Sequence, residues 1–248
     1  MDALRNDARV IAIDLPGIGL SEMPAPSNDK RTLARCVRGL IRALGLADVT
    51  LVGHDIGGQI AHAYLHAFPG ELKRAVLMNI VIPGVEPWSK VVRNPHLWHF
   101  AFHTVPELPE TLIEGHPARY FDFFYDRLAG PVGVSARARE LYVAAYARPL
   151  ALRTGFEWYR AFAQDERDNL AVRGHPVATP VLYLRGDHES GDISEYVTGL
   201  RASGLQDVDG AIIPSSGHFA PDEQAQVVAA LLRRFISAAR QPRAQLTT

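Results

Sequence analysis

The chain is poor in cysteine, in long apolar runs and in net charge, and each shortage excludes a class of protein. Among its 248 residues there is one cysteine, Cys36, which can form no disulfide within the chain. No run approaches the ~18 apolar residues of a membrane-spanning helix, and the first residues do not read as a signal peptide. The net charge is −1. We therefore expect neither a membrane nor a nucleic acid as partner, because no basic stripe is available to neutralise phosphates.

The histidines do not indicate a metal site, although the chain has ten of them. His62 and His66 have the spacing that lets one helix face present two ligands, but no convincing third ligand accompanies them. We interpret this pair as helix-surface histidines. The sequence therefore predicts no metal and no cofactor.

The remaining composition is that of a globular protein with one sizeable core. Apolar residues make up 47% of the chain and charged residues 21%. A chain of this length and composition favours a single core carrying an insertion over two independent domains.

Short apolar runs alternate with helical patterns along most of the chain. Strands separated by helices favour a parallel sheet covered on both faces, which is an α/β fold. The expected strands are Arg9–Asp14, Val49–Val52, Arg74–Asn79, Pro180–Arg185 and Gly210–Pro214, and the expected helices are Lys30–Leu44, Gln59–Ala67 and Asp222–Ala239.

The alternation stops between Pro83 and Pro176, where aromatic residues are frequent and prolines break the helical stretches. This region predicts a helical insertion, or cap. A cap over the carboxyl ends of strands can bind substrate and exclude water. The expected division is a core of residues 1–84 and 176–248 and a cap of residues 85–175.

A Gly-x-Asp-x-Gly motif at Gly53–Gly57 follows the apolar run Val49–Val52 and precedes a helical pattern. This is the strand, turn and helix of a nucleophile elbow, with Asp55 where serine is usual. We expect both glycines of the motif to be required by close backbone packing. An aspartate nucleophile attacks a saturated carbon and leaves an alkyl ester, so substrates of the epoxide or alkyl halide type follow. The alternative is a buried Asp55 that caps the next helix.

Several motifs further along the chain occur together with the elbow in one order. They are Leu97–Phe102, Leu108–Glu110, Gly155–Arg160 and Ser216–Phe219. With Gly53–Gly57 they resemble α/β-hydrolases of the epoxide hydrolase branch, nearest to the bacterial Cif-type enzymes. The similarity runs from about Arg9 to Phe235. It implies an α/β-hydrolase fold with an inserted helical cap.

The resemblance also implies a two-step reaction with named residues. Asp55 would open the epoxide, and His218 would activate a water that attacks the Asp55 ester and releases a vicinal diol. His99 and Tyr159 stand where Cif-type enzymes hold the epoxide oxygen. Without the resemblance, these two residues would be interpreted as a buried histidine and a core-facing aromatic residue.

The resemblance separates epoxide hydrolysis from dehalogenation at one position. Haloalkane dehalogenases usually carry tryptophan after the nucleophile, and fluoroacetate dehalogenases carry arginine. Here the residue is Ile56, whose side chain donates no hydrogen bond. Its backbone N–H is the one donor it offers, and we expect that group to bind an oxyanion. Dehalogenation of a haloalkane or haloacid stays the alternative reaction. Four aromatic residues either line a pocket for a small apolar epoxide or pack the cap: Trp98, Phe100, Phe102 and Trp158.

The acid that orients His218 is the first departure from the family. Cif-type enzymes place a glutamate where this chain has Asn79, which carries no negative charge. Other members place the acid after the next core strand, where Glu189 aligns. Asp187 is the alternative, because a small shift of the alignment in this loop would place it at the position of the acid. We expect Glu189 to be the acid.

The second departure lies at the beginning of the chain. Family members have three strands before Arg9–Asp14, and a His-Gly-x-Pro loop that supplies an oxyanion donor. None of this is present, so the chain resembles an N-terminally truncated member with a gap between Arg9–Asp14 and Val49–Val52. Either the natural chain begins upstream of Met1, which we prefer, or this is a trimmed variant. A hydrolase-fold binding protein that turns over poorly is the alternative function.

We expect a cytoplasmic protein for the chain as given, with secretion as the alternative if the natural start lies upstream, because some Cif-type enzymes are secreted. The oligomeric state stays open, with a homodimer as one alternative.

Overall fold

A four-stranded parallel sheet forms the centre of the protein in the computed structural model, which describes residues 2–238. Val76 in the second strand pairs with Val52 on one side and Leu182 on the other. The sheet confirms the predicted parallel arrangement, with small shifts of the strand ends. In the order β1-β2-β3-β4 the strands are β1 (Thr50–His54), β2 (Arg74–Met78), β3 (Val181–Gly186) and β4 (Val208–Ile213).

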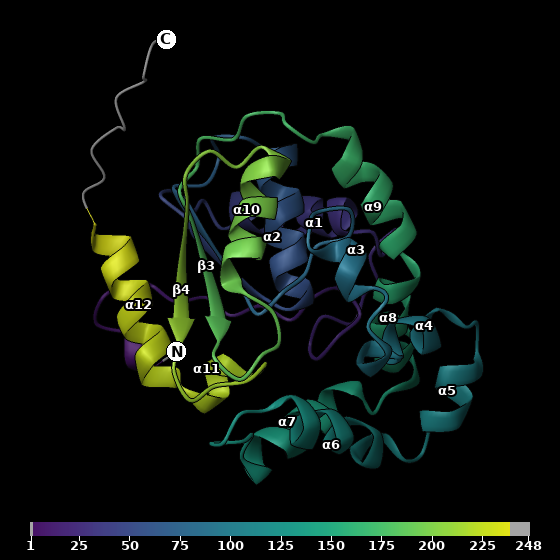
Figure 1. Cartoon of the computed structure of the whole chain (residues 1–248). Helices are drawn as coiled ribbons and strands as arrows, with labels where there is room; N and C mark the ends of the chain where they lie inside the picture. Colours follow the sequence, from purple (N-terminus) through teal and green to yellow (C-terminus); the bar gives the residue numbers. More distant parts are fainter. Residues whose placement is uncertain (1, 239–248) are drawn as a thin grey trace.

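Helices cover both faces of this sheet, and the alternation of side chains along the strands explains why (Figure 1). In β2, Ala75 and Leu77 belong to the core cluster under α1, α2 and α10. Val76 and Met78 point the other way and belong to the cluster under α12. The helices around the sheet are η1 (Asp2–Leu4), α1 (Lys30–Ala43), α2 (Ile56–Ala67), α10 (Ile193–Ser203), α11 (Ala220–Glu223) and α12 (Ala225–Ser237).

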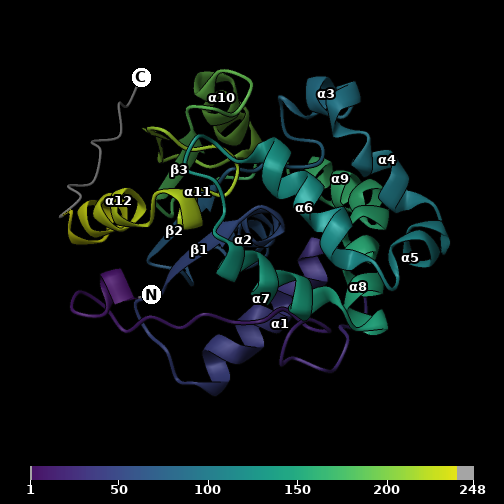
Figure 2. The same ribbon diagram turned by 90° about the horizontal axis from the view of Figure 1, so that it is seen from below.

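The chain between β2 and β3 is helical, as predicted, and part of it, including α6 and α7, lies beyond the carboxyl ends of the strands, whereas α9 packs beside α1. In Figure 1 the arrowheads of β3 and β4 point toward the end of the molecule where α6 and α7 lie, and Figure 2 looks onto that end. The predicted domain boundaries at residues 85 and 175 stay a prediction. The helices are α3 (Trp88–Val91), η2 (Pro95–Leu97), α4 (His99–Thr104), α5 (Leu108–Ile113), α6 (Pro117–Leu128), α7 (Ala136–Tyr146), α8 (Pro149–Arg160) and α9 (Phe162–Ala171).

The final helix differs in detail from the prediction over Asp222–Ala239. It is divided into α11 and α12, and the predicted end at Ala239 lies outside the described residues. Nowhere between residues 2 and 238 is there a helix with the length and apolar character needed to span a membrane.

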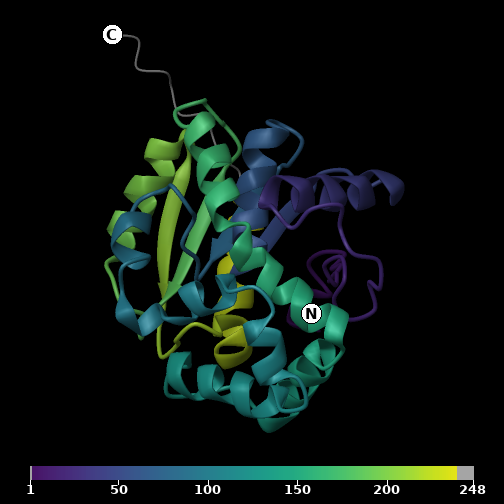
Figure 3. The ribbon, with the colours of Figure 1, turned by 90° about the vertical axis from the view of Figure 1, so that its right-hand side faces the viewer.

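The predicted strand Arg9–Asp14 is wrong. This segment has no ladder hydrogen bonds, and the N-terminal residues run outside the sheet (Figure 3). Its apolar side chains are partly exposed, from 36% at Val10 to 40% at Ile11 and Ile13. An apolar run becomes a strand only when a neighbour supplies backbone partners. β1 forms the edge of the described sheet, and Val52 on it is 44% exposed.

A buried ion pair joins α1 to the α8–α9 region. Lys30 donates from Nζ to Asp165 Oδ2 at 2.7 Å and to the carbonyl of Trp158 at 2.6 Å, while its backbone N–H binds Asp165 Oδ1 at 2.7 Å. Both side chains are almost fully buried. Burial lowers the pKa of Lys30 and raises that of Asp165, against their mutual attraction. The pair therefore fixes the helices at a desolvation cost.

Asp165→Asn should destabilise the protein by about 3–5 kcal/mol, because it leaves the Lys30 ammonium buried without its counter-ion. The double variant Lys30→Met/Asp165→Leu should recover most of that free energy of unfolding, since it buries no charge. Urea denaturation measures both values. Equal losses in the single and double variants would contradict this account.

Candidate active site

The candidate nucleophile Asp55 stands at a sharp turn between β1 and α2. Its backbone has φ 50° and ψ −126°, a conformation that residues other than glycine rarely adopt. The Asp55 N–H donates to the carbonyl of Met78 at 3.1 Å, which holds the turn against β2. The Asp55 side chain is 46% exposed, so its carboxylate faces open space. The predicted strand–turn–helix geometry is present.

The glycines of this turn are not all required for the reason predicted. A Cβ on Gly53 would lie 2.2 Å from the carbonyl oxygen of Gly57, and one on Gly58 would lie 2.6 Å from Ile80 Cγ2. A Cβ on Gly57 would meet no atom within 4 Å. The expectation for Gly57 is therefore wrong, because a Cβ there has open space, and Gly58 makes the close approach to Ile80.

Gly53→Ala should prevent correct folding of the elbow, whereas Gly57→Ala should fold normally. The helical position of Gly57 predicts a gain of about 0.5–1 kcal/mol from better helix propensity. Soluble yield and thermal melting compare the variants. A Gly53→Ala protein as stable as wild type would refute the close approach.

His218 lies between two carboxylates that come from distant parts of the chain. Its Nδ1 is 2.8 Å from Glu189 Oε1, and its Nε2 is 3.8 Å from Asp55 Oδ2. His218 follows β4 and Glu189 follows β3, so parallel strands bring both to the edge where Asp55 ends β1. His54 approaches from the elbow, with Nε2 2.6 Å from the carbonyl of His218.

The two alternative acids make other contacts. Asp187 accepts hydrogen bonds from the N–H groups of Ser215 and Ser216 at 2.9 and 3.0 Å, which stabilises the loop before His218. Asn79 donates from Nδ2 to the carbonyl of Gly217 at 3.0 Å. Of the three candidates in this region, Glu189 is the one whose carboxylate binds the His218 ring.

The charges of this group depend on one another. Burial lowers the pKa of His218, but the negative charges of Asp55 and Glu189 and the hydrogen bond to Glu189 outweigh burial and raise it to about 10. Desolvation opposes ionisation of the buried Glu189 and of the half-exposed Asp55, yet the His218 imidazolium holds the pKa of Asp55 and of Glu189 below their usual values. At neutral pH the imidazole is therefore protonated while Asp55 is ionised.

Asp55→Asn should lower the pKa of His218 from about 10 toward its ordinary value, because one of its two negative neighbours is lost. A pH titration of the His218 ring by NMR measures this shift in wild type and variant. An unchanged pKa would show that Asp55 does not control the charge of the imidazole.

His99 in α4 and Tyr159 in α8 lie together, with ring centroids 5.9 Å apart. Burial lowers the pKa of His99 to about 4, against the attraction of Asp55. Burial and the Asp55 charge raise the pKa of Tyr159 far above its usual value. At neutral pH His99 is therefore uncharged and Tyr159 keeps its proton, so both can donate hydrogen bonds.

Sequence reasoning missed two residues beside this pair. Tyr146, at the end of α7, has its pKa raised by burial and then by the charge of Asp55. His103 packs on Tyr159 at 4.3 Å between ring centroids and hydrogen-bonds the hydroxyl of Tyr120. Its spacing of four from His99 on α4 was the available signal, whereas no motif marks Tyr146.

The four predicted pocket aromatics have different surroundings. Phe100 and Trp158 belong to the core, and the Phe100 ring is 5.7 Å from that of Tyr159. Phe102 packs against a small buried cluster within the helical region. Trp98 is 42% exposed and contacts Phe102 at 5.7 Å. Phe100 is thus the member of the set that lies beside both candidate donors, 4.8 Å from the His99 ring and 5.7 Å from the Tyr159 ring.

The backbone N–H of Ile56 is the first of helix α2, so helix geometry gives it no partner within the helix. It lies next to the candidate nucleophile and at the positive end of the helix dipole. Such a group can stabilise an oxyanion that forms on the Asp55 carboxyl.

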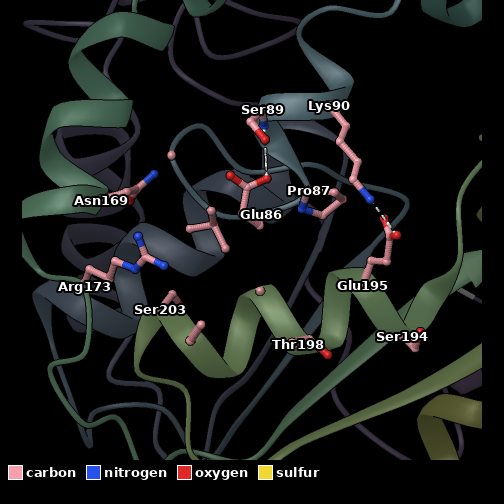
Figure 4. A pocket seen from close by; sticks show the side chains of 14 residues that line it. Glu86, Pro87, Ser89, Lys90, Asn169, Arg173, Ser194, Glu195, Thr198 and Ser203 are labelled. Carbon is pink, nitrogen blue, oxygen red and sulfur yellow. Dashed lines mark hydrogen bonds and ion pairs between the residues drawn. The ribbon is translucent and has the colours of Figure 1, made fainter.

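A groove of about 570 Å³ lies elsewhere, between α9, α10 and the loop before α3 (Figure 4). Its lining contains none of the candidate catalytic residues. Its charged side chains include Lys90 and Glu195, which pair at 2.7 Å, and Glu86, which accepts from the Ser89 hydroxyl at 2.7 Å. The groove is therefore distinct from the site around Asp55.

The interpretation of His62 and His66 as surface histidines is wrong for His62, which is completely buried. α2 packs against α10 at this point, and His62 Nε2 is 3.2 Å from the hydroxyl of Ser203. Within residues 2–238, no group of three or more histidine, cysteine or acidic side chains is arranged to hold a metal ion.

A parallel sheet whose strand ends carry an elbow aspartate, a histidine and an acid defines a hydrolase of the α/β class. The family described as alpha/beta hydrolase fold matches residues 1–225. The chain belongs to the α/β-hydrolase superfamily, in its epoxide hydrolase branch, and it is a hydrolase.

Individual relatives agree with this placement. A soluble epoxide hydrolase from a Corynebacterium species is 30% identical, with 91% of this chain and 80% of the relative covered. The crystal structure of Cfl2 from Burkholderia cenocepacia superposes with a TM-score of 0.79 and 33% identity, covering 90% of this chain and 77% of that one. A fluoroacetate dehalogenase from a Burkholderia species is 28% identical, covering 96% and 81%.

Proposed function

We propose that the protein hydrolyses small apolar epoxides to vicinal diols through an ester on Asp55. The observation that carries the proposal is the position of His218, 2.8 Å from Glu189 and 3.8 Å from Asp55. Similarity to epoxide hydrolases supports epoxides as the substrate class. The helices of residues 85–175 form the cap over this site.

The first step is attack of an Asp55 oxygen on an epoxide carbon. A carbon–oxygen bond to the enzyme forms as the ring bond breaks, and the ring oxygen becomes an alkoxide. Tyr159 and neutral His99 donate hydrogen bonds to this oxygen from the cap side. Both groups have the protonation state that donation requires.

The same step changes the charge of His218. Esterified Asp55 carries no negative charge, so the pKa of His218 falls and its proton becomes available to the alkoxide. The neutral imidazole then takes a proton from water, and the resulting hydroxide attacks the ester carbon. Glu189 stabilises the imidazolium that forms, and the Ile56 N–H stabilises the oxyanion. When the ester bond breaks, the departing alkoxide takes the remaining proton of the attacking hydroxide, so the diol leaves and Asp55 is again a carboxylate beside the His218 imidazolium.

His218→Gln should form the Asp55 ester and fail to cleave it. Styrene oxide is the probe, and intact-protein mass spectrometry with peptide mapping detects the adduct. Wild type should release diol and show little adduct, whereas the variant should accumulate one adduct on Asp55. Asp55→Asn is the matched control and should form no adduct.

The alternatives give different outcomes in this experiment. No adduct in folded His218→Gln, together with no diol from wild type, would contradict the proposed function. An adduct that persists in wild type would indicate the binding protein that turns over poorly. Release of fluoride from fluoroacetate, without diol formation from the epoxide, would support the dehalogenase suggested by the Burkholderia relative.

A further inference from the structure

The two carboxylate oxygens of Glu189 have different partners. Oε1 is 2.8 Å from His218 Nδ1, and Oε2 is 2.9 Å from Arg185 Nη1. Both members of the Glu189–Arg185 pair are largely buried, with 14% and 7% of their side chains exposed. The proposed acid is thus hydrogen-bonded to the histidine at one oxygen, whereas its other oxygen makes an ion pair with the guanidinium and accepts no hydrogen bond.

Arg185 is itself held in place from several sides. Its Nη1 donates to the Tyr183 hydroxyl at 3.2 Å, and its Nη2 donates to the carbonyl of Ser190. Its guanidinium lies over the Tyr196 ring, 4.0 Å from the centroid. The Tyr183 hydroxyl in turn donates to the carbonyl of Ile80 at 2.8 Å. The cation is therefore fixed before any substrate binds.

We infer that Arg185 is a positioning residue that fixes the direction and charge of the Glu189 carboxylate for cleavage of the Asp55 ester. The inference rests on the proposed function and adds to it a residue that acts on Glu189 and not on the substrate. A planar, always charged guanidinium suits a buried carboxylate better than lysine does. Arg185 also sits at the end of β3, four residues before Glu189, so the pair is set by one short loop.

The electrostatic consequence has a definite sign. A cation next to Glu189 keeps this carboxyl ionised at lower pH, and it weakens the negative potential that the carboxyl exerts on His218. Loss of the cation raises the pKa of Glu189 and of His218. It therefore raises the pH below which ester cleavage slows, which is the acid limb of the pH profile, whichever of the two groups controls it. The other titratable or charged groups that interact with Glu189 or His218 are Asp55 and His54 from the elbow, His99 from α4, Tyr183 from β3 and Tyr196 from α10.

Arg185→Met should raise the acid limb of adduct clearing by about one pH unit, as expected for loss of an adjacent opposite charge. Styrene oxide, rapid quenching and intact-protein mass spectrometry give adduct formation and clearing rates separately at each pH. Formation should be unchanged, because Asp55 and not Glu189 carries it out. Arg185→Lys, which keeps a positive charge but not the planar guanidinium, should restore part of the wild-type profile.

Arg74→Met is the matched control for losing a largely buried guanidinium. Arg74 begins β2, at the opposite ends of the strands, and it donates to the carbonyl of Ala238 at 2.9 Å. This variant should leave the acid limb where wild type has it. The same shift in both variants would mean that lost stability, and not the contact with Glu189, moves the profile, and it would overturn the inference.

A measurement without turnover separates the inference from the proposed function. The proton shared by His218 Nδ1 and Glu189 gives a far-downfield NMR signal while Glu189 is ionised. In Arg185→Met this signal should be lost at a higher pH on the acid side than in wild type. No adduct in folded His218→Gln, together with no diol from wild type, would overturn the proposed function alone, whereas an unmoved signal and an unmoved clearing limb would overturn the inference alone.

Discussion

One imidazole between two carboxylates is the interaction on which the proposed chemistry depends. His218 approaches Glu189 on one side and Asp55 on the other, and together the two raise its pKa to about 10. The resting histidine is therefore a cation that keeps Asp55 ionised as a nucleophile. When Asp55 becomes an ester, the histidine loses one of its two negative neighbours. The first step thus prepares the base that the second step needs.

The parallel sheet makes this arrangement possible. Asp55, Glu189 and His218 follow β1, β3 and β4, whose carboxyl ends meet at the same edge of the sheet. The helical region then places His99 and Tyr159 beyond that edge. The geometry of this helical region is itself fixed by polar contacts to buried or half-buried groups.

Two of those contacts span separate helices of this region. Arg160 in α8 binds both carboxylate oxygens of Glu110 in α5, at 2.7 and 2.9 Å. The pair of Lys30 and Asp165 ties α1 to α9, next to the backbone of Trp158. Tyr159 therefore lies at the C-terminal end of α8, between the residue that binds α5 and the backbone carbonyl that binds Lys30 of the core.

Much of the fold and of the site could be predicted from the sequence because the signals are local. The helix predicted from Lys30 to Leu44 is present as α1, where Asp29 accepts a hydrogen bond from the N–H of Thr32 as N-cap. The elbow could be predicted because its glycine spacing reflects a strained turn. Glu189 could be placed only within a short loop, and its hydrogen bond to His218 distinguishes it from Asp187.

The remaining features depend on tertiary partners that a single sequence does not display. Arg9–Asp14 has the composition of a strand but finds no ladder partner. His62 is buried because α10 covers it, and the local spacing carries no sign of this. Arg185 reads as an ordinary charged residue until its contact with Glu189 is seen. Gly57 matches the motif without needing the space that Gly53 and Gly58 need.

A single turnover in heavy-oxygen water tests the central claim most directly. With enzyme in excess over styrene oxide, the account predicts that the heavy oxygen enters the Asp55 carboxylate, because water attacks the ester carbonyl, and that the diol receives its new oxygen from the enzyme. Peptide mass spectrometry locates the label. Heavy oxygen in the diol after one turnover, with Asp55 unlabelled, would show direct attack of water on the epoxide and contradict the account.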